Sequence, residues 1–201
     1  MKPEIVGDVS SLPDAAFSHR SLIWWGVLGF ILIEGTAFLL AGGSYFFLMN
    51  HTTPWPPHRV PPDLLIGSAF TALVIASELP NVWTDRVAHA ERLLPTRIGL
   101  GIMTLIGLAL LVLRWYEFQA LNVSWDDNAY GSIVWALLAL HTVHLLTDWV
   151  DTLVLTVFAF MHDLKRTHYS DVTDNCLYWH FVALAWLPIY ALLYWVPRML
   201  K

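Results

Sequence analysis

The chain has 201 residues, of which 57% are hydrophobic and only 13% are charged, roughly half the charged share of an ordinary soluble domain. This composition excludes an intrinsically disordered chain and argues against a soluble fold. The net charge of −5 and the scattered Lys and Arg residues argue against a nucleic-acid partner, because phosphate binding needs a concentrated basic face.

Five apolar stretches are long enough to cross a bilayer as helices, since a hydrocarbon core of about 30 Å takes about 20 helical residues. They cover residues 22–49, 64–83, 98–116, 132–160 and 176–196. We therefore predict an all-α polytopic membrane bundle with five transmembrane helices. These helices form a single domain at residues 22–198, which follows a polar segment at residues 1–21.

The first stretch, Leu22 to Met49, is too long to be the apolar core of a signal peptide, so we expect it to be retained as a spanning helix. Its single charged residue is Glu34. The connection that follows is rich in proline, from Pro54 to Pro62. Proline has no amide hydrogen and a fixed backbone angle, which predicts a stiff extended ledge.

The distribution of Lys and Arg predicts the orientation. Seven of these residues fall on the side of the N-terminal segment and the second and fourth connections, and four fall on the opposite side. The seven are Lys2, Arg20, Arg86, Arg92, Arg97, Lys165 and Arg166, and the four are Arg59, Arg114, Arg198 and Lys201. We expect an integral membrane protein of the bacterial inner (plasma) membrane with a cytoplasmic N-terminus.

Glu34 is predicted to lie near mid-membrane, far in sequence from any basic residue. An ionised carboxylate there costs on the order of 2.5 to 3.5 kcal/mol, so such acids face the bundle interior and are often functional. One interpretation is a protonatable group beside a proton or lipid site. The other is a neutral acid hydrogen-bonded to a second helix.

Two further acids and two histidines are candidates. Glu78 lies five residues before the predicted end of its helix, where it could reach the headgroups. His141, His144 and Asp148 share one helical face. This face could coordinate a metal or form a seam of hydrogen bonds between helices.

A metal or haem on this chain is not expected. No Glu-x-x-His motif precedes His141 or His144, and di-iron bundles use that motif. A haem held between two helices needs histidines on separate spans, whereas both of these lie on one. The remaining candidate, His180, is predicted to lie close to a helix end.

Ordered landmarks along the chain resemble subunit III of the haem–copper terminal oxidases, in its short five-helix form. The first helix and its exit carry Trp24-Trp25-Gly26, Glu34, Ser44-Tyr45-Phe46 and Pro54-Trp55-Pro56-Pro57. The middle carries Thr96, Tyr116-Glu117, Tyr130-Gly131-Ser132 and His141-x-x-His144. The last helix carries Tyr178-Trp179-His180-Phe181-Val182, Trp186 and Tyr194-Trp195. Ala183, Asp148 and Ser77-Glu78-Leu79-Pro80 depart from the usual family pattern.

The resemblance implies a non-catalytic subunit of a respiratory complex that packs on oxidase subunit I and lies near subunit II. Haem and copper would belong to the partner, and this chain would hold phospholipid and support proton uptake. The implied proton or lipid cleft comprises Glu34, His141, His144, Glu78 and Asp148. Contacts to lipid headgroups or other subunits would come from Trp25, Trp55, His180 and Trp186. No residue is expected to be catalytic.

Two alternatives stay open. One is the subunit III homologue associated with nitric oxide reductase. The other is a stand-alone membrane metal-binding protein that uses His141, His144, Asp148 and a glutamate from another helix.

Overall fold

The structure, a computed structural model, describes residues 22–57 and 61–199, which form long helices and contain no strand. The helices are α1 (Leu22–His51), α2 (Leu64–His89), α3 (Leu93–Gln119), α4 (Ala129–Met161) and α5 (Arg166–Tyr190). A π-helical turn, η1 (Ala191–Trp195), joins α5 to the short α6 (Val196–Met199). Five segments are long and apolar enough to cross a membrane, which confirms the predicted all-α fold. The predicted polar segment at residues 1–21 lies outside the described residues.

The helices extend further than hydropathy alone predicts. α2 continues to His89 rather than residue 83, and α5 starts at Arg166 rather than residue 176. Both extensions contain polar residues such as Asp85 and Asp171, so they were not included in the apolar stretches read from the sequence. They are nevertheless helical. One consequence is that Glu78 and His180, each predicted near a helix end, lie well inside their helices.

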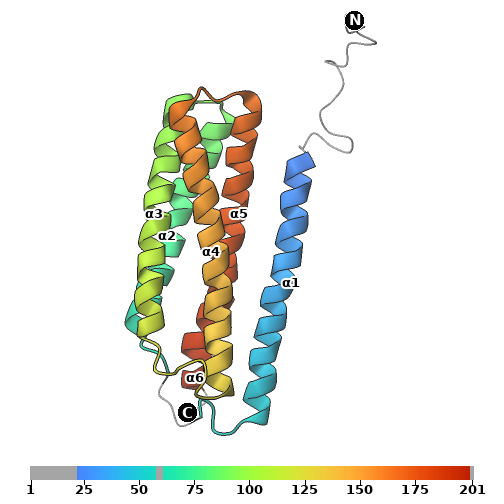
Figure 1. Ribbon diagram of the computed structural model, residues 1–201, viewed down its shortest axis with the longest axis vertical. Coiled ribbons are helices and arrows are strands. Elements are labelled where there is room, and N and C mark those ends of the chain that lie inside the picture. Colours follow the sequence, from blue (N-terminus) through green and yellow to red (C-terminus); the bar gives the residue numbers. More distant parts are fainter. Residues whose placement is uncertain (1–21, 58–60, 200–201) are drawn as a thin grey trace, which may run out of the picture.

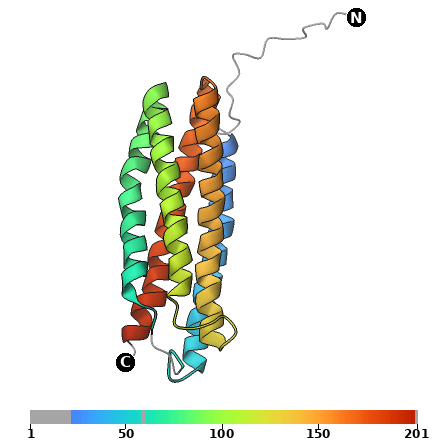
Figure 2. The same ribbon diagram turned by 60° about the vertical axis from the view of Figure 1, so that its left-hand side comes forward.

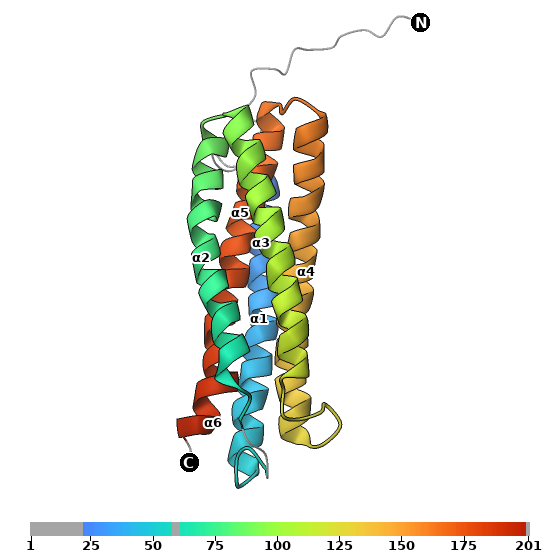
Figure 3. The same cartoon turned by 90° about the vertical axis from the view of Figure 1, so that its left-hand side faces the viewer.

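Successive helices run up and down in an antiparallel bundle (Figure 1). In Figure 1, α1 stands at one edge of the bundle, and Figures 2 and 3 place α2 and α3 on the side away from it. α1 packs on α4 and α5, and Tyr45 is the one fully buried residue of this helix. α1 is therefore a peripheral helix, and most of its apolar surface is available to lipid or to another protein.

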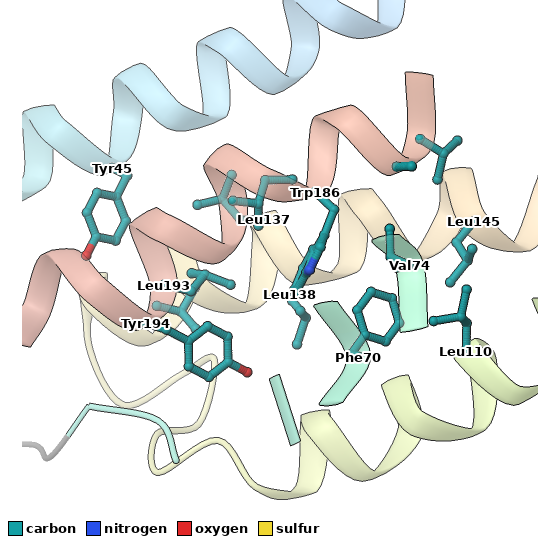
Figure 4. Close-up of a cluster of buried hydrophobic side chains, with 14 of the residues drawn as sticks. Tyr45, Phe70, Val74, Leu110, Leu137, Leu138, Leu145, Trp186, Leu193 and Tyr194 are labelled. Atoms are coloured by element: carbon teal, nitrogen blue, oxygen red, sulfur yellow. The ribbon is translucent and has the colours of Figure 1, made fainter. Parts of the chain in front are cut away.

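The core lies among α2, α3, α4 and α5 and is rich in aromatic rings (Figure 4). Trp186 of α5 is completely buried, and its indole nitrogen donates to the hydroxyl of Thr71 at 2.8 Å. The ring of Phe70 meets that of Trp186 edge-on at 4.8 Å between centroids. A side chain at Gly67 would overlap the ring of Tyr194, so this glycine allows α2 to approach η1 closely.

Candidate functional site

Glu34 is the centre of a polar contact between three helices. The hydroxyl of Tyr178, on α5, donates to Glu34 Oε2 at 2.5 Å. On α4, His144 places its Nε2 atom 3.4 Å from Glu34 Oε1. The side chains of Glu34 and His144 are only 14% and 9% exposed, so the contact is largely withdrawn from the surface. The sequence prediction that Glu34 faces the bundle interior is confirmed.

One proton has two possible positions in this pair. The Nδ1–H group of His144 donates to the carbonyl of Leu140 at 2.6 Å, which leaves Nε2 directed at Glu34. With the proton on Glu34, both groups are neutral. With the proton on Nε2, they form an ion pair. The geometry therefore allows one proton to be shared between the carboxyl and the imidazole.

Aromatic rings and an apolar groove adjoin this pair. The ring of Phe38 lies 4.7 Å from that of His144, and Phe30 stacks on Tyr178 at 5.9 Å. Next to them, a groove of about 910 Å³ opens between α1 and the face of α4 and α5. Its walls are almost wholly apolar and include Ile31, Leu39, Leu137, Phe181, Ile189 and Leu192. A groove of this kind suits a hydrocarbon chain rather than a polar ligand.

His141 belongs to a different cluster from His144. Arg114 Nη2 donates to His141 Nδ1 at 2.9 Å, and His141 Nε2 donates to the carbonyl of Val182 at 3.1 Å. Both ring nitrogens of His141 are thus engaged. The structure therefore does not place His141 with Glu34, although the two histidines lie on one helical face.

Arg114 is the centre of this second cluster, which sequence analysis missed. Its Nη1 donates to Glu117 Oε2 at 2.7 Å, and both side chains are 1% exposed. Tyr194 donates its hydroxyl to Glu117 Oε1 at 2.5 Å. The guanidinium also lies 3.8 Å from the ring centre of Phe70 and 4.2 Å from that of Trp186.

The burial of Arg114 changes the charge count from which the orientation was predicted. That count placed Arg114 among four basic residues outside the spans, but Arg114 lies inside the bundle. The signal in the sequence was the opposite charge of Glu117 three residues later, since residues at that spacing are neighbours on a helix.

Glu78 forms a pair with His180. Its Oε2 atom accepts from His180 Nδ1, and the two side chains are 30% and 34% exposed. The amide of Asn81 lies against the same imidazole and donates to the carbonyl of Cys176 at 3.0 Å. The helix of Glu78 continues for eleven residues to His89, so Glu78 lies within α2 rather than near its end.

The predicted surface tryptophans divide into two kinds. Trp25 is 48% exposed, which leaves it available for a lipid or subunit contact. Trp55 is 8% exposed and donates to the hydroxyl of Tyr45 at 3.0 Å. Trp186 is fully buried and has no surface for such a contact, so the structure contradicts that prediction for this residue.

The metal-binding alternative requires His141, His144, Asp148 and a glutamate to converge. Asp148 accepts instead from Asn175 of α5, at 3.2 Å from Oδ1. Within residues 22–57 and 61–199, no three His, Cys, Asp or Glu side chains come together in a way that could hold a metal ion. The residues required by that hypothesis thus fall in three contacts: His144 with Glu34, His141 with Arg114, and Asp148 with Asn175.

Comparison with known proteins identifies the family. The model of the family "Cytochrome c oxidase subunit III" matches residues 23–197. The chain belongs to the cytochrome c oxidase subunit III family. Cytochrome c oxidase subunit 3 of Drosophila yakuba is similar to it, with 26% identity over 85% of this chain and 68% of the relative. The cytochrome c oxidase subunit 3 of Lumbricus terrestris is 24% identical over 88% of this chain and 73% of the relative. Family membership agrees with the resemblance found in the sequence.

Proposed function

We propose that this chain is the non-catalytic subunit III of a respiratory haem–copper terminal oxidase. In this role it packs on the catalytic subunit I, beside subunit II, holds membrane phospholipid and supports proton uptake. The match to the cytochrome c oxidase subunit III family over residues 23–197 carries this proposal. Haem and copper belong to the partner subunits.

The contact between Glu34 and His144 supports the role in proton uptake. A carboxyl and an imidazole nitrogen 3.4 Å apart can exchange one proton with little movement. Tyr178 holds the other carboxyl oxygen in place. Glu34 would take up a proton on its way to the catalytic subunit, with His144 as the alternative position.

The apolar groove supports the role in lipid binding. It lies between the peripheral α1 and the helices α4 and α5, and its lining includes Gly35 and Gly42 of α1. A phospholipid acyl chain would fill it and join α1 to the rest of the bundle. The exposed apolar face of α1 is also suitable for packing on subunit I.

Co-purification tests the proposal. The membrane is extracted in mild detergent, the complex is isolated by a tag after Lys201, and subunit masses and the reduced-minus-oxidised spectrum are recorded. Haem bands together with a large partner subunit are expected. The haem type and the preferred acceptor then distinguish an oxygen-reducing complex from a nitric oxide reductase. A lone 22.9 kDa chain from conditions that preserve complexes would overturn the proposal.

A further inference from the structure

A second polar cluster lies beyond His144 on α4. Asp148 follows His144 by four residues and so lies one helical turn further along the same face. Its side chain is directed at α5, and the residue is 2% exposed. Asp151, on the next turn, is exposed at the surface of the helix. A buried carboxyl and a surface carboxyl are thus adjacent on α4.

The side chain of Asn175 connects the two carboxyls. Its Nδ2 atom donates to Asp148 Oδ1 at 3.2 Å and to Asp151 Oδ2 at 3.3 Å. Its carbonyl oxygen accepts from the hydroxyl of Thr152 at 3.1 Å. Because Thr152 occupies the carbonyl oxygen, the NH₂ group is held facing both acids.

The second oxygen of Asp148 has no hydrogen-bond partner within the described part of the chain, and it is buried. Asp151, whose carboxyl accepts from the same amide, carries the same sign of charge as an ionised Asp148. An ionised carboxylate buried in a membrane bundle without a cation is costly, whereas a protonated carboxyl is tolerated. A proton on Oδ2 removes the charge and leaves Oδ1 free to accept from Asn175.

We propose that Asp148 holds a proton in the interior of the bundle, and that Asn175, which donates to both Asp148 and Asp151, fixes the positions of the two carboxyls. The proton resides on Asp148 Oδ2, the oxygen that has no hydrogen-bond partner within the described part of the chain. When the proton leaves, the carboxylate keeps its hydrogen bond from Asn175. Asp148 and Glu34 have different hydrogen-bond partners, so a variant of either carboxyl can be tested separately.

Other titratable side chains lie around the site. On α5, these are Tyr178 and Cys176 near Asp148, and Asp171 near Asp151. Tyr178 also donates to Glu34 of α1. His144, one turn before Asp148 on α4, faces Glu34.

Infrared difference spectroscopy of the intact detergent-purified complex tests the site. The signal is the C=O stretching band of a protonated carboxylic acid, recorded in water and after transfer to D₂O. Asp148→Asn should abolish one such band. Asp151→Asn is the matched control, because it removes the acid bonded to the same amide. It should retain the band.

Two results would overturn the proposal. One is an unchanged set of acid bands in Asp148→Asn. The other is loss of the parent band on addition of Na⁺ at constant pH, which would identify a metal cation as the ligand. If Asp148→Asn does not assemble, Thr152→Val is used, since it releases the Asn175 carbonyl. That variant should shift the band, and an unshifted band would count equally against the site.

Discussion

Nε2 of His144 lies 3.4 Å from Oε1 of Glu34, so an acid of α1 faces a titratable nitrogen of α4 in the interior of a membrane bundle. The residues are 110 positions apart in the sequence (144 − 34). Their approach joins the peripheral α1 to α4. The hydroxyl of Tyr178 holds the carboxyl on its other side.

Loss of the Tyr178 hydroxyl should weaken this site without removing the acid. In Tyr178→Phe, Glu34 loses the donor to Oε2 and keeps His144. We expect Glu34 to lose about 0.5–1.5 kcal/mol of interaction, as for a typical hydrogen bond. The carboxyl stretching band of Glu34 should then shift in the infrared spectrum. Tyr116→Phe, at an exposed tyrosine of α3, is the control and should leave the band unchanged.

The buried ion pair of Arg114 and Glu117 gives a prediction about stability. Glu117→Gln leaves the guanidinium buried without its counter-charge, and removal of one partner of such a pair typically costs about 3–5 kcal/mol. The double variant Arg114→Met with Glu117→Gln should be less destabilised than Glu117→Gln alone. Thermal unfolding of the purified complex measures the difference, and equal losses in the two variants would contradict the prediction.

An exposed ion pair provides the matched control for this experiment. Arg166 and Glu91 lie 3.6 Å apart with side chains that are 92% and 54% exposed. Solvent screening makes such pairs worth about 0–1 kcal/mol. Glu91→Gln should therefore leave the unfolding temperature nearly unchanged.

The fold was predictable because long apolar runs determine spanning helices, and all five runs can be recognised in the sequence. The sequence also predicted that Glu34 faces the interior, because a carboxyl in an apolar run is costly where it faces lipid. Pairings across helices were harder to predict. His141 and His144 lie on the same face, yet they contact different helices, because a face of α4 is wide enough to touch both α1 and α3.

Hydropathy also misplaced residues near the helix ends. The helices α2 and α5 continue as polar turns beyond their apolar stretches. Glu78 and His180 were therefore predicted to lie near helix ends, whereas they lie within their helices and pair with each other. Arg114 was taken for an interfacial charge because it lies close to the end of the apolar run. Its burial depends on Glu117, His141 and Tyr194, which come from three helical segments. The cytoplasmic N-terminus stays a prediction.

The contact between Glu78 and His180 should contribute modestly to stability. Both side chains are about one-third exposed, so Glu78→Gln should destabilise the complex by about 0.5–1.5 kcal/mol. Asp85→Asn is the control, because the pair of Asp85 with His89 is more exposed at the helix end. A larger loss in Asp85→Asn than in Glu78→Gln, measured by denaturation of the purified complex, would contradict this ranking.

Trp186 should be important for packing rather than for lipid contact. Trp186→Phe removes the donor to Thr71 and part of a buried ring, which typically costs about 1–3 kcal/mol. Trp25→Phe, at an exposed ring of α1, should cost less than about 0.5 kcal/mol. Similar losses in the two variants, measured by thermal unfolding, would argue against this division of roles.

The most direct test of the central claim compares the purified complex with its Glu34→Gln variant, which keeps the shape of the side chain but cannot exchange a proton with His144. The measurement is steady-state turnover and its decline over repeated cycles, with Glu91→Gln as the control. We predict that Glu34→Gln assembles with all partner subunits and loses turnover, or the durability of turnover, while the control behaves as the parent does. Full and lasting turnover in an assembled Glu34→Gln complex would contradict the claim that Glu34 supports proton uptake.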